Sequence, residues 1–486
     1  MKNLSLDKVS LAKNTFYSAI SSLSNLFLLI LLIIAGRYLG SVDYGIFTFA
    51  LAFVFIFEIF TDLGLRELSQ RTVARDKELS TKYFGNILVW KLVLSVIIFA
   101  ILVLSINAVK SSPETRFAVY ILGFATILKS FKWTCLSFFR AFERFDLSSL
   151  TLCIERLALL VVGGVVLLRG GGLIYFASVF AIVRVFDLIL TFAILNWKVV
   201  KIVPRFDINF LKKLQIEALP FGFYAIIFIL YSHIDTVMLS FLRTDADVGW
   251  YNGAHKIYEG LTVFPAIICG VLYPRLSQLF ISNKKAHFAL SLRASKYMFI
   301  ISFPLLICGI ILSSNIINTL FGKEFQNSII ALQILLLGVV FVFQIWLFHT
   351  ILNSIDKQKL VMYIGLVGLV VNIILNSLFI PRYSFKGAAA TTVLSQLLVF
   401  ALCHFYLYTS YHKFSLLKLS VKPFFASLVV GTLLWKFNIV SLVFSLAFIF
   451  LLYIPLLFCF KTFDHEELDL IGKLLRKKRK ISALLL

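Results

Sequence analysis

The chain has 486 residues, of which 60% are hydrophobic and only 15% are charged, and its mean hydropathy is +0.95. This composition excludes a soluble globular protein, because too few polar residues are present to cover the surface of so long a chain. The net charge of +23 would favour nucleic-acid binding in a soluble protein, but the basic residues here fall in short connectors between apolar runs, which predicts an all-α integral membrane protein with no nucleic-acid partner.

Apolar runs of about 20 residues, the length that crosses a bilayer core as a helix, recur from one end of the chain to the other. The predicted spans are 14–36, 44–63, 83–105, 117–138, 147–168, 173–196, 218–242, 248–273, 295–313, 328–351, 360–380, 386–408, 421–436 and 440–460. Lys436 and Asn438 interrupt an apolar run that could otherwise make the last two spans one bent element. About fourteen transmembrane helices are therefore expected.

Basic residues are distributed unevenly between the two ends of these spans. The side that holds both termini carries 32 of the 47 Lys and Arg residues, the opposite side carries 9, and the rest lie within spans. Because Lys and Arg concentrate in cytoplasmic loops, we predict a multi-pass protein of the cell membrane with both termini in the cytoplasm.

The turn after the first predicted span is repeated after the seventh. The two turns read Tyr38-Leu39-Gly40-Ser41-Val42-Asp43-Tyr44-Gly45 and Phe241-Leu242-Arg243-Thr244-Asp245-Ala246-Asp247-Val248-Gly249. Since six spans separate them, the two halves would share their orientation and be related by a pseudo-two-fold axis along the membrane normal.

The predicted organisation is an N-terminal six-helix bundle at 1–200, a basic cytoplasmic linker at 201–217, a C-terminal six-helix bundle at 218–410, two extra transmembrane helices at 411–462, and a cytoplasmic amphipathic basic tail at 463–486. The glycines of both turns are expected to supply the backbone freedom of a tight connector.

The hairpin at 219–276 carries the most specific pattern. It reads, in order, Asp235, Leu239, Val248-Gly249-x-Tyr251, Ala254 and Pro274-Arg275-Leu276. This order resembles the middle of the polysaccharide biosynthesis and export flippases, which include O-antigen and oligosaccharide flippases, of the multidrug/oligosaccharidyl-lipid/polysaccharide exporter superfamily. The stretch at 35–47 is similar to the first inter-helix turn of that family. The resemblance implies a flippase that moves a polyprenyl-(pyro)phosphate-linked oligosaccharide from the cytoplasmic to the outer leaflet by alternating access, for surface polysaccharide or glycan assembly.

Two lysines within one predicted span are candidate contacts for the phosphates of such a cargo. Lys129 and Lys132 lie three residues apart with no acid in the same span, and their repulsion would be costly in a dry site. Water, an anion or a remote carboxylate must compensate, unless both side chains reach the interface. The further candidate substrate-binding residues are Arg156, Arg184 and Lys256 within spans, and Arg37 and Arg243 at the outer turns, which are interface anchors first and release-side phosphate contacts second.

Acidic residues within the spans can either pair with nearby basic residues or act as coupling or cavity acids. Arg184 and Asp187, and likewise Lys256 and Glu259, are three residues apart and can neutralise each other within one helix. Glu155 and Arg156 are adjacent and each need a partner on another helix, whereas Lys91 can snorkel to the cytoplasmic interface. The candidate coupling or cavity acids are Asp235, Glu259 and Glu58. For Asp235 three roles stay open: accepting a hydrogen bond, pairing with Lys256, or binding a coupling ion, which would be a proton or sodium.

Several motifs of enzymes are missing from the sequence. There is no Walker A loop, GxSxG or HExxH motif, the external connectors are short, and the cysteines show no CxxC spacing. We therefore expect neither enzymatic activity nor a metal site or cofactor, apart from the coupling ion, and a glycan polymerase or ligase is disfavoured.

The sequence leaves two other functions open. The alternative is an ion-coupled multidrug or small-molecule antiporter of the same superfamily, whose cavity should carry net acid, whereas the embedded charges here are six basic and five acidic residues. A non-transporting scaffold stays open as well. The expected partners are membrane lipids, a lipid-linked oligosaccharide and glycan-assembly enzymes.

Overall fold

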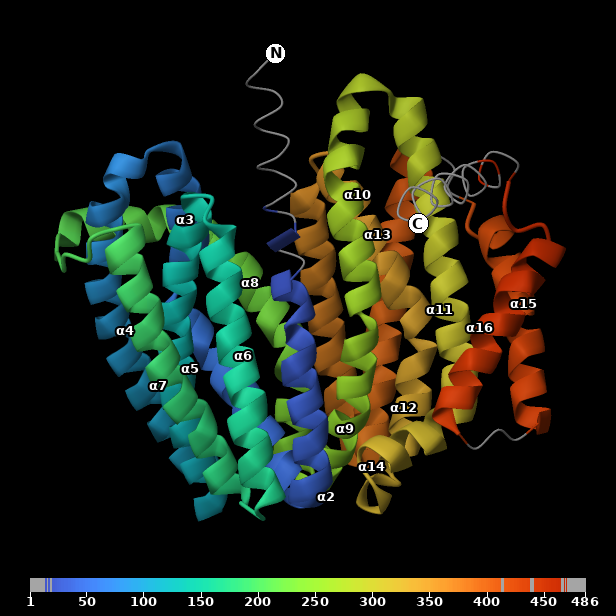
Figure 1. Ribbon diagram of the computed structural model, residues 1–486, viewed down its shortest axis with the longest axis horizontal. Coiled ribbons are helices and arrows are strands. Elements are labelled where there is room, and N and C mark those ends of the chain that lie inside the picture. The colour runs from blue at the N-terminus through green and yellow to red at the C-terminus, as the bar shows by residue number, and fades with distance from the viewer. Residues whose placement is uncertain are drawn as a thin grey trace, which may run out of the picture. The chain divides into compact units, whose positions relative to one another are not determined.

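The computed structural model describes residues 14, 16–17, 20–411, 415–437, 441–464, 467 and 469. In this part of the chain all regular structure is helical (Figure 1). The α-helices are α2 Asn25–Glu58, α3 Leu65–Arg75, α4 Ser80–Val109, α5 Pro113–Ala141, α6 Phe145–Leu168, α7 Leu173–Lys198, α8 Ile208–Leu242, α9 Asp245–Leu261, α10 Val263–Ser282, α11 Lys284–Leu320, α12 Ser328–Leu337, α13 Val339–Ser354, α14 Gln358–Tyr406, α15 Leu417–Phe437 and α16 Leu442–Cys459. Short 3-10 turns lie at Ile59–Thr61, Lys77–Leu79 and Lys323–Phe325, and a π-helical turn lies at Leu407–Tyr411.

Eleven helical stretches in the described residues are long and apolar enough to cross a membrane, or twelve if the bent pair α12 and α13 forms one span. Two of these stretches contain a break, at Gly40 in α2 with φ 76° and at Ser384 in α14 with φ 52°. Each break separates two of the predicted spans, so the helices are consistent with the expected number. The chain is a multi-pass membrane protein. The predicted basic tail at 463–486 lies almost wholly outside the described residues.

Local sequence signals explain where several helices begin. At the start of α5, the Ser112 hydroxyl accepts a hydrogen bond from the Thr115 amide, and Pro113 occupies the first helical position, where its missing N–H costs nothing. At the start of α8, the Asp207 carboxylate accepts a hydrogen bond of 3.0 Å from the Phe210 amide. The expected conformational role of glycine holds at Gly40 only. Gly45 and Gly249 lie inside helices, where the missing Cβ permits a close backbone approach.

The chain divides into two compact units, each built from separate stretches. The first contains Met1–Gly260, Ile317–Ala331 and Met362–Ser395, and the second contains Leu261–Ile316, Leu332–Val361 and Gln396–Leu486. In the first unit, α4 to α7 lie side by side (Figure 1) around a core that includes Phe84, Phe138 and Leu195. In the second, α15 packs along α16, and both contribute to a core with Cys308. The division into bundles at 1–200 and 218–410 stays a prediction.

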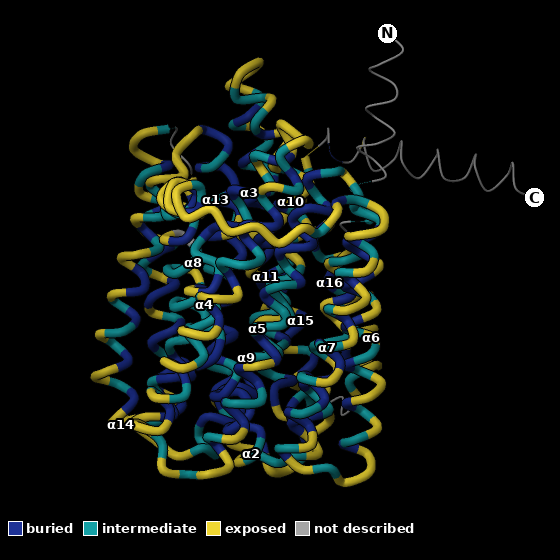
Figure 2. Tube along the Cα trace, turned by 90° about the vertical axis from the view of Figure 1, so that its left-hand side faces the viewer, coloured by how far each residue is buried: buried dark blue, intermediate teal, exposed yellow. Residues whose placement is uncertain are grey.

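Exposed apolar side chains mark helix faces that the protein does not cover. On α6, Leu157, Val161, Val165 and Leu168 are all exposed and recur at helical spacing. Figure 2 shows such exposed positions along the length of α6 and α14 rather than only at their ends. A continuous apolar stripe is what a helix presents to acyl chains, so these faces fit contact with lipid.

Candidate functional site

Four charged side chains are brought together by α5, α6 and α7 in the first unit. The Lys132 ammonium lies 2.8 Å from Glu155 Oε2 and 2.7 Å from Asp187 Oδ2, and it also donates to the Thr151 carbonyl oxygen at 3.0 Å. Its side chain is 1% exposed. An ammonium has three hydrogens, so these three contacts leave Lys132 no donor for a ligand in this conformation. The expected remote carboxylates exist, and here they make Lys132 a buried cross-link rather than an open phosphate contact.

Arg184 completes this group. Its Nε lies 3.6 Å from Glu155 Oε1, and its Nη1 donates to the Thr126 hydroxyl at 3.3 Å. Arg184 and Asp187, which the spacing allowed to neutralise each other, make their close ion pairs with other partners among the described residues, because packing brings Asp187 against Lys132 of α5 and Arg184 against Glu155 of α6. Two cations and two carboxylates balance within this buried group.

Lys129 has a different environment from Lys132, although the two lie one turn apart on α5. Lys129 Nζ lies 3.0 Å from Glu58 Oε2 at the end of α2, and 4.3 Å from the centre of the Phe55 ring. The ring of His233, from α8, lies 5.1 Å from the same Phe55 ring. The Lys129 side chain is 22% exposed. Lys129 is therefore a partly exposed cation whose ion-pair partner among the described residues is Glu58, and it lies next to an aromatic and imidazole surface.

Lys256 and Glu259 form the local pair that their spacing predicts. The Lys256 ammonium lies 2.6 Å from Glu259 Oε2 on α9, and the two side chains are 19% and 55% exposed. The ring of His255 stacks on Tyr251 one turn earlier. Lys256 is thus a partly exposed cation, and its carboxylate partner is exposed as well.

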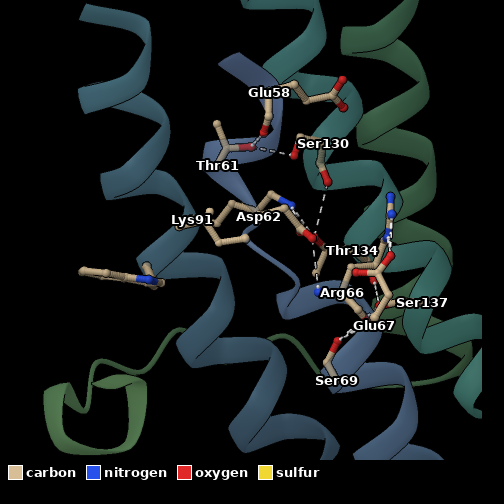
Figure 3. A network of polar contacts seen from close by, with 12 residues as sticks. Glu58, Thr61, Asp62, Arg66, Glu67, Ser69, Lys91, Ser130, Thr134 and Ser137 are labelled. Carbon is tan, nitrogen blue, oxygen red and sulfur yellow. Dashed lines mark hydrogen bonds and ion pairs between the residues drawn. The ribbon is translucent and has the colours of Figure 1, made fainter. Parts of the chain in front are cut away.

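Lys91 and Asp62 form a further pair that links α4 to the turn after α2. Lys91 Nζ donates to Asp62 Oδ1 at 2.7 Å and to the Thr134 hydroxyl of α5 at 2.9 Å (Figure 3). The predicted snorkelling of Lys91 was wrong, since its side chain is buried against this carboxylate. Asp62 follows the membrane helix, which ends at Thr61. Burial alone would raise the pKa of Asp62, but the nearby charges of Lys91 and Arg66 outweigh it and hold that pKa below its usual value.

Asp235 of α8 accepts hydrogen bonds from neutral groups only. Asn376 Nδ2 donates to Oδ1 at 2.5 Å, and the hydroxyls of Thr392 and Tyr251 donate to Oδ2 at 2.6 and 3.0 Å. Of the three roles predicted for Asp235, hydrogen-bond acceptance is the one observed, while Lys256 pairs with Glu259. Within the described residues no Lys, Arg or His nitrogen forms an ion pair with Asp235, and the hydrogen bonds to it come from Tyr251, Thr392 and Asn376.

Three of the four arginines expected to contact phosphate, Arg156, Arg37 and Arg243, bind backbone carbonyls. Arg156 of α6 donates to Ser21 O at 2.5 Å and also to the Ser24 hydroxyl. At the outer turns, Arg37 donates to Thr319 O at 2.8 Å, and Arg243 donates to the carbonyls of Ile380 and Pro381. These contacts fit the role of structural anchors.

Two groups of site residues were missed in the sequence. Asp62 is a single acid at the end of a span, and Asn372 and Asn376 lie four residues apart in α14, with Asn376 Nδ2 donating to Asn372 Oδ1 at 3.0 Å. The spacing of the two amides on one helix face, within an apolar run that needs no amide, was the signal that could have identified them.

The arrangement can bind an anionic group without any covalent chemistry. Lys129 and Lys256 are accessible cations whose acids can exchange for another anion, whereas Lys132 and Arg184 are enclosed. Asp235 is a carboxylate with a ready set of neutral oxygen neighbours, which suits a proton or a small cation.

Comparisons with known proteins agree with this description. The family model described as "Polysaccharide biosynthesis protein" matches residues 11–280, which is more than half of the chain, and the MatE model matches residues 220–378. A membrane protein of Methanocaldococcus jannaschii described as uncharacterized is 31% identical over 204 residues, 40% of each chain. The probable flippase AglR of Haloferax volcanii is 29% identical over 173 residues, covering 35% of this chain and 36% of the relative. The chain thus spans less than half the length of these relatives.

Solved structures share the fold. The lipid II flippase MurJ in an inward closed conformation superposes with a TM-score of 0.78 at 17% identity, covering 91% of this chain and 98% of that chain. At this identity the likeness shows the fold alone. The family model carries the assignment: the chain belongs to the polysaccharide biosynthesis protein family.

Proposed function

We propose that this protein is a flippase that moves a polyprenyl-(pyro)phosphate-linked oligosaccharide from the cytoplasmic to the outer leaflet, for surface polysaccharide or glycan assembly. The observation that carries the proposal is the pair of accessible cations, Lys129 and Lys256, inside a membrane protein of this family. Relatives named as a flippase and as an O-antigen transporter support it. Such a headgroup cannot cross hydrocarbon unaided, because its phosphates and hydroxyls would lose their hydration.

Binding would proceed by exchange of anions. A phosphate oxygen would take the place of the Glu58 carboxylate at Lys129 or of Glu259 at Lys256, so that the cation is never left unpaired. Lys132 and Arg184 would support this step indirectly, by tying α5, α6 and α7 together. Arg156, Arg37 and Arg243 would hold the ends of helices rather than the cargo.

Asp235 is the proposed coupling site. Its carboxylate is surrounded by the oxygen and amide groups of Tyr251, Thr392 and Asn376, and a proton or a sodium ion bound there would neutralise the charge. Because Asp235 lies on α8 and its hydrogen-bond donors come from α9 and α14, loading the ion would change the contacts among these three helices.

The protein would work as a transporter, not as an enzyme, in the cell membrane with both termini in the cytoplasm. Membrane lipids would surround the exposed faces of α6 and α14, and glycan-assembly enzymes would supply and consume the cargo.

Reconstitution tests the function. Proteoliposomes that contain a fluorescent polyprenyl-pyrophosphate oligosaccharide should expose it to an impermeant quencher faster than protein-free liposomes do. Equal rates in both would contradict the flippase assignment. A fluorescent lipid with the same chain and no phosphate serves as the control for general scrambling.

An ion-coupled multidrug or small-molecule antiporter is the second candidate, and the match to the MatE model at 220–378 favours it. The same vesicles, loaded with a cationic dye and given a proton or sodium gradient, separate the two functions. Gradient-driven dye transport without cargo transfer would favour the antiporter.

A further inference from the structure

Two glycines of the repeated turns lie against each other's backbone in the first unit. A Cβ added at Gly45 would lie 1.8 Å from the Asp245 carbonyl oxygen, and a Cβ added at Gly249 would lie 1.9 Å from the Ser41 carbonyl oxygen. Each of these carbonyls belongs to the residue four positions before the other glycine. The contact is therefore reciprocal: equivalent positions of α2 and α9 approach one another so closely that no side chain fits between them.

A second reciprocal contact flanks the first. Lys110, the residue directly after α4, donates to the Ser240 carbonyl oxygen of α8 at 2.7 Å. Phe321, the residue directly after α11, covers Gly36 of α2, where an added Cβ would lie 2.5 Å from the ring. Ser240 lies nine residues before Gly249, and Gly36 lies nine residues before Gly45. Thus the third span of each predicted half ends on the same position of the first span of the other half.

Aromatic and charged side chains surround these contacts. Tyr44, next to Gly45, packs against the rings of Phe321 and Phe325, whose centroids lie 6.1 and 5.8 Å away. Lys110 Nζ also lies 3.7 Å from Asp245 Oδ1 and 5.2 Å from the centre of the Phe49 ring. Backbone contact, ring packing and one ion pair therefore close the same end of the unit.

We propose that these reciprocal contacts form the outer gate of the transporter, closed in this structure, and that the gate opens by separation of α2 from α9 at Gly45 and Gly249. The proposal rests on the proposed transport function. It also rests on the predicted topology, which places this end of the helices on the outer side of the membrane. A packed crossing that depends on backbone contact weakens steeply as it opens, because a gap of about 0.5–1 Å already forfeits roughly a quarter to a half of the contact energy. Lys110 links the two predicted halves, and its hydrogen bond to the Ser240 carbonyl oxygen must break before they separate.

Glycine substitution gives a direct test. Gly45→Ala and Gly249→Ala place a methyl group against backbone, which cannot move aside as a side chain can, so both should hold the gate open. Gly164→Ala on α6 and Gly270→Ala on α10 are matched controls, since nothing lies within 4 Å of a Cβ at either position. All four changes add one methyl group to a glycine in a helix.

The reporter is a cysteine in place of Ser240, whose side chain is buried and whose hydroxyl forms no hydrogen bond among the described residues. An impermeant maleimide added from outside to intact cells should label Ser240→Cys slowly, with the parent protein correcting for its own cysteines. Adding Gly45→Ala or Gly249→Ala should speed labelling at least about tenfold, a change of ~1.4 kcal/mol in the opening equilibrium. Labelling as slow as in the two controls, or labelling only from the cytoplasmic side, would overturn the proposal.

Lys110→Gln covers the case in which the glycine variants fail to fold, as judged by size-exclusion profile after extraction. It removes the ammonium but leaves the backbone contacts, so labelling should rise by a smaller factor, while Lys110→Arg should stay close to the parent. An unchanged labelling rate in Lys110→Gln would overturn the proposed role of Lys110. If the glycine variants also misfold, the same result would overturn the proposal of an outer gate. Labelling requires no cargo, so a failure of the flippase assignment and a failure of the gate remain distinguishable.

Discussion

Lys132 Nζ lies 2.7 Å from Asp187 Oδ2, and both side chains of this ion pair are buried. Glu155 contacts the same ammonium from α6, so three helices share one enclosed cation. Lys129, one turn earlier, keeps part of its side chain exposed. The sequence presents these two lysines as equivalent. From their surroundings we expect Lys132 to stabilise the bundle and Lys129 to exchange its partner for a phosphate of the cargo.

Replacing Lys132 with Met should destabilise the protein strongly. The change leaves Glu155 and Asp187 buried without their shared cation, and breaking a buried pair in this way costs about 3–5 kcal/mol. The midpoint of thermal unfolding in detergent should fall clearly for Lys132→Met and little for Lys129→Met. Asp187→Leu in the Lys132→Met background should recover part of the loss. Equal midpoints for the two lysine variants would contradict the assignment.

Asp235→Asn should preserve the fold and remove ion coupling. The amide oxygen can still accept from Asn376, and the hydroxyls of Tyr251 and Thr392 can turn to accept from the new amide group. Without the charge, cargo transfer should no longer respond to an imposed proton or sodium gradient. Flipping is measured with and without each gradient, alongside Asn372→Asp, which keeps Asp235. A gradient response in Asp235→Asn equal to that of the parent would refute the coupling role.

The segment after α16 should be held by one buried ion pair in the second unit. Lys296 of α11 lies 2.6 Å from Glu467 Oε2 and 3.2 Å from Asp464 Oδ2, but only the Glu467 carboxylate is buried. Glu467→Ala should therefore release the segment, whereas Asp464→Ala should have little effect because exposed pairs contribute about 0–1 kcal/mol. Limited proteolysis near the C-terminus measures this release. Equal cleavage rates in the two variants would count against the anchor.

The sequence was sufficient for the apolar spans and for the local pair of Lys256 and Glu259, since both depend on spacing within one helix. It was not sufficient for Lys91 and Arg184, whose partners come from other segments of the chain. The rotation of each helix about its axis decides which side chains meet, and hydropathy fixes that rotation only coarsely. For the same reason the sequence predicted that Gly45 supplies backbone freedom in a turn, whereas it lies inside α2 and allows the close approach of α9, a helix that is distant in sequence.

In the proposed transport cycle, Lys129 and Lys256 are the contacts for a phosphorylated cargo. The decisive measurement is the rate at which a fluorescent polyprenyl-pyrophosphate oligosaccharide reaches the opposite leaflet of proteoliposomes, for the parent, Lys129→Ala, Lys256→Ala and the exposed control Lys359→Ala. Loss of one charge-assisted hydrogen bond, worth about 1.5–3 kcal/mol, predicts a rate at least about tenfold lower for each site variant. The control should match the parent. Parental rates in both Lys129→Ala and Lys256→Ala, with normal folding, would contradict the account.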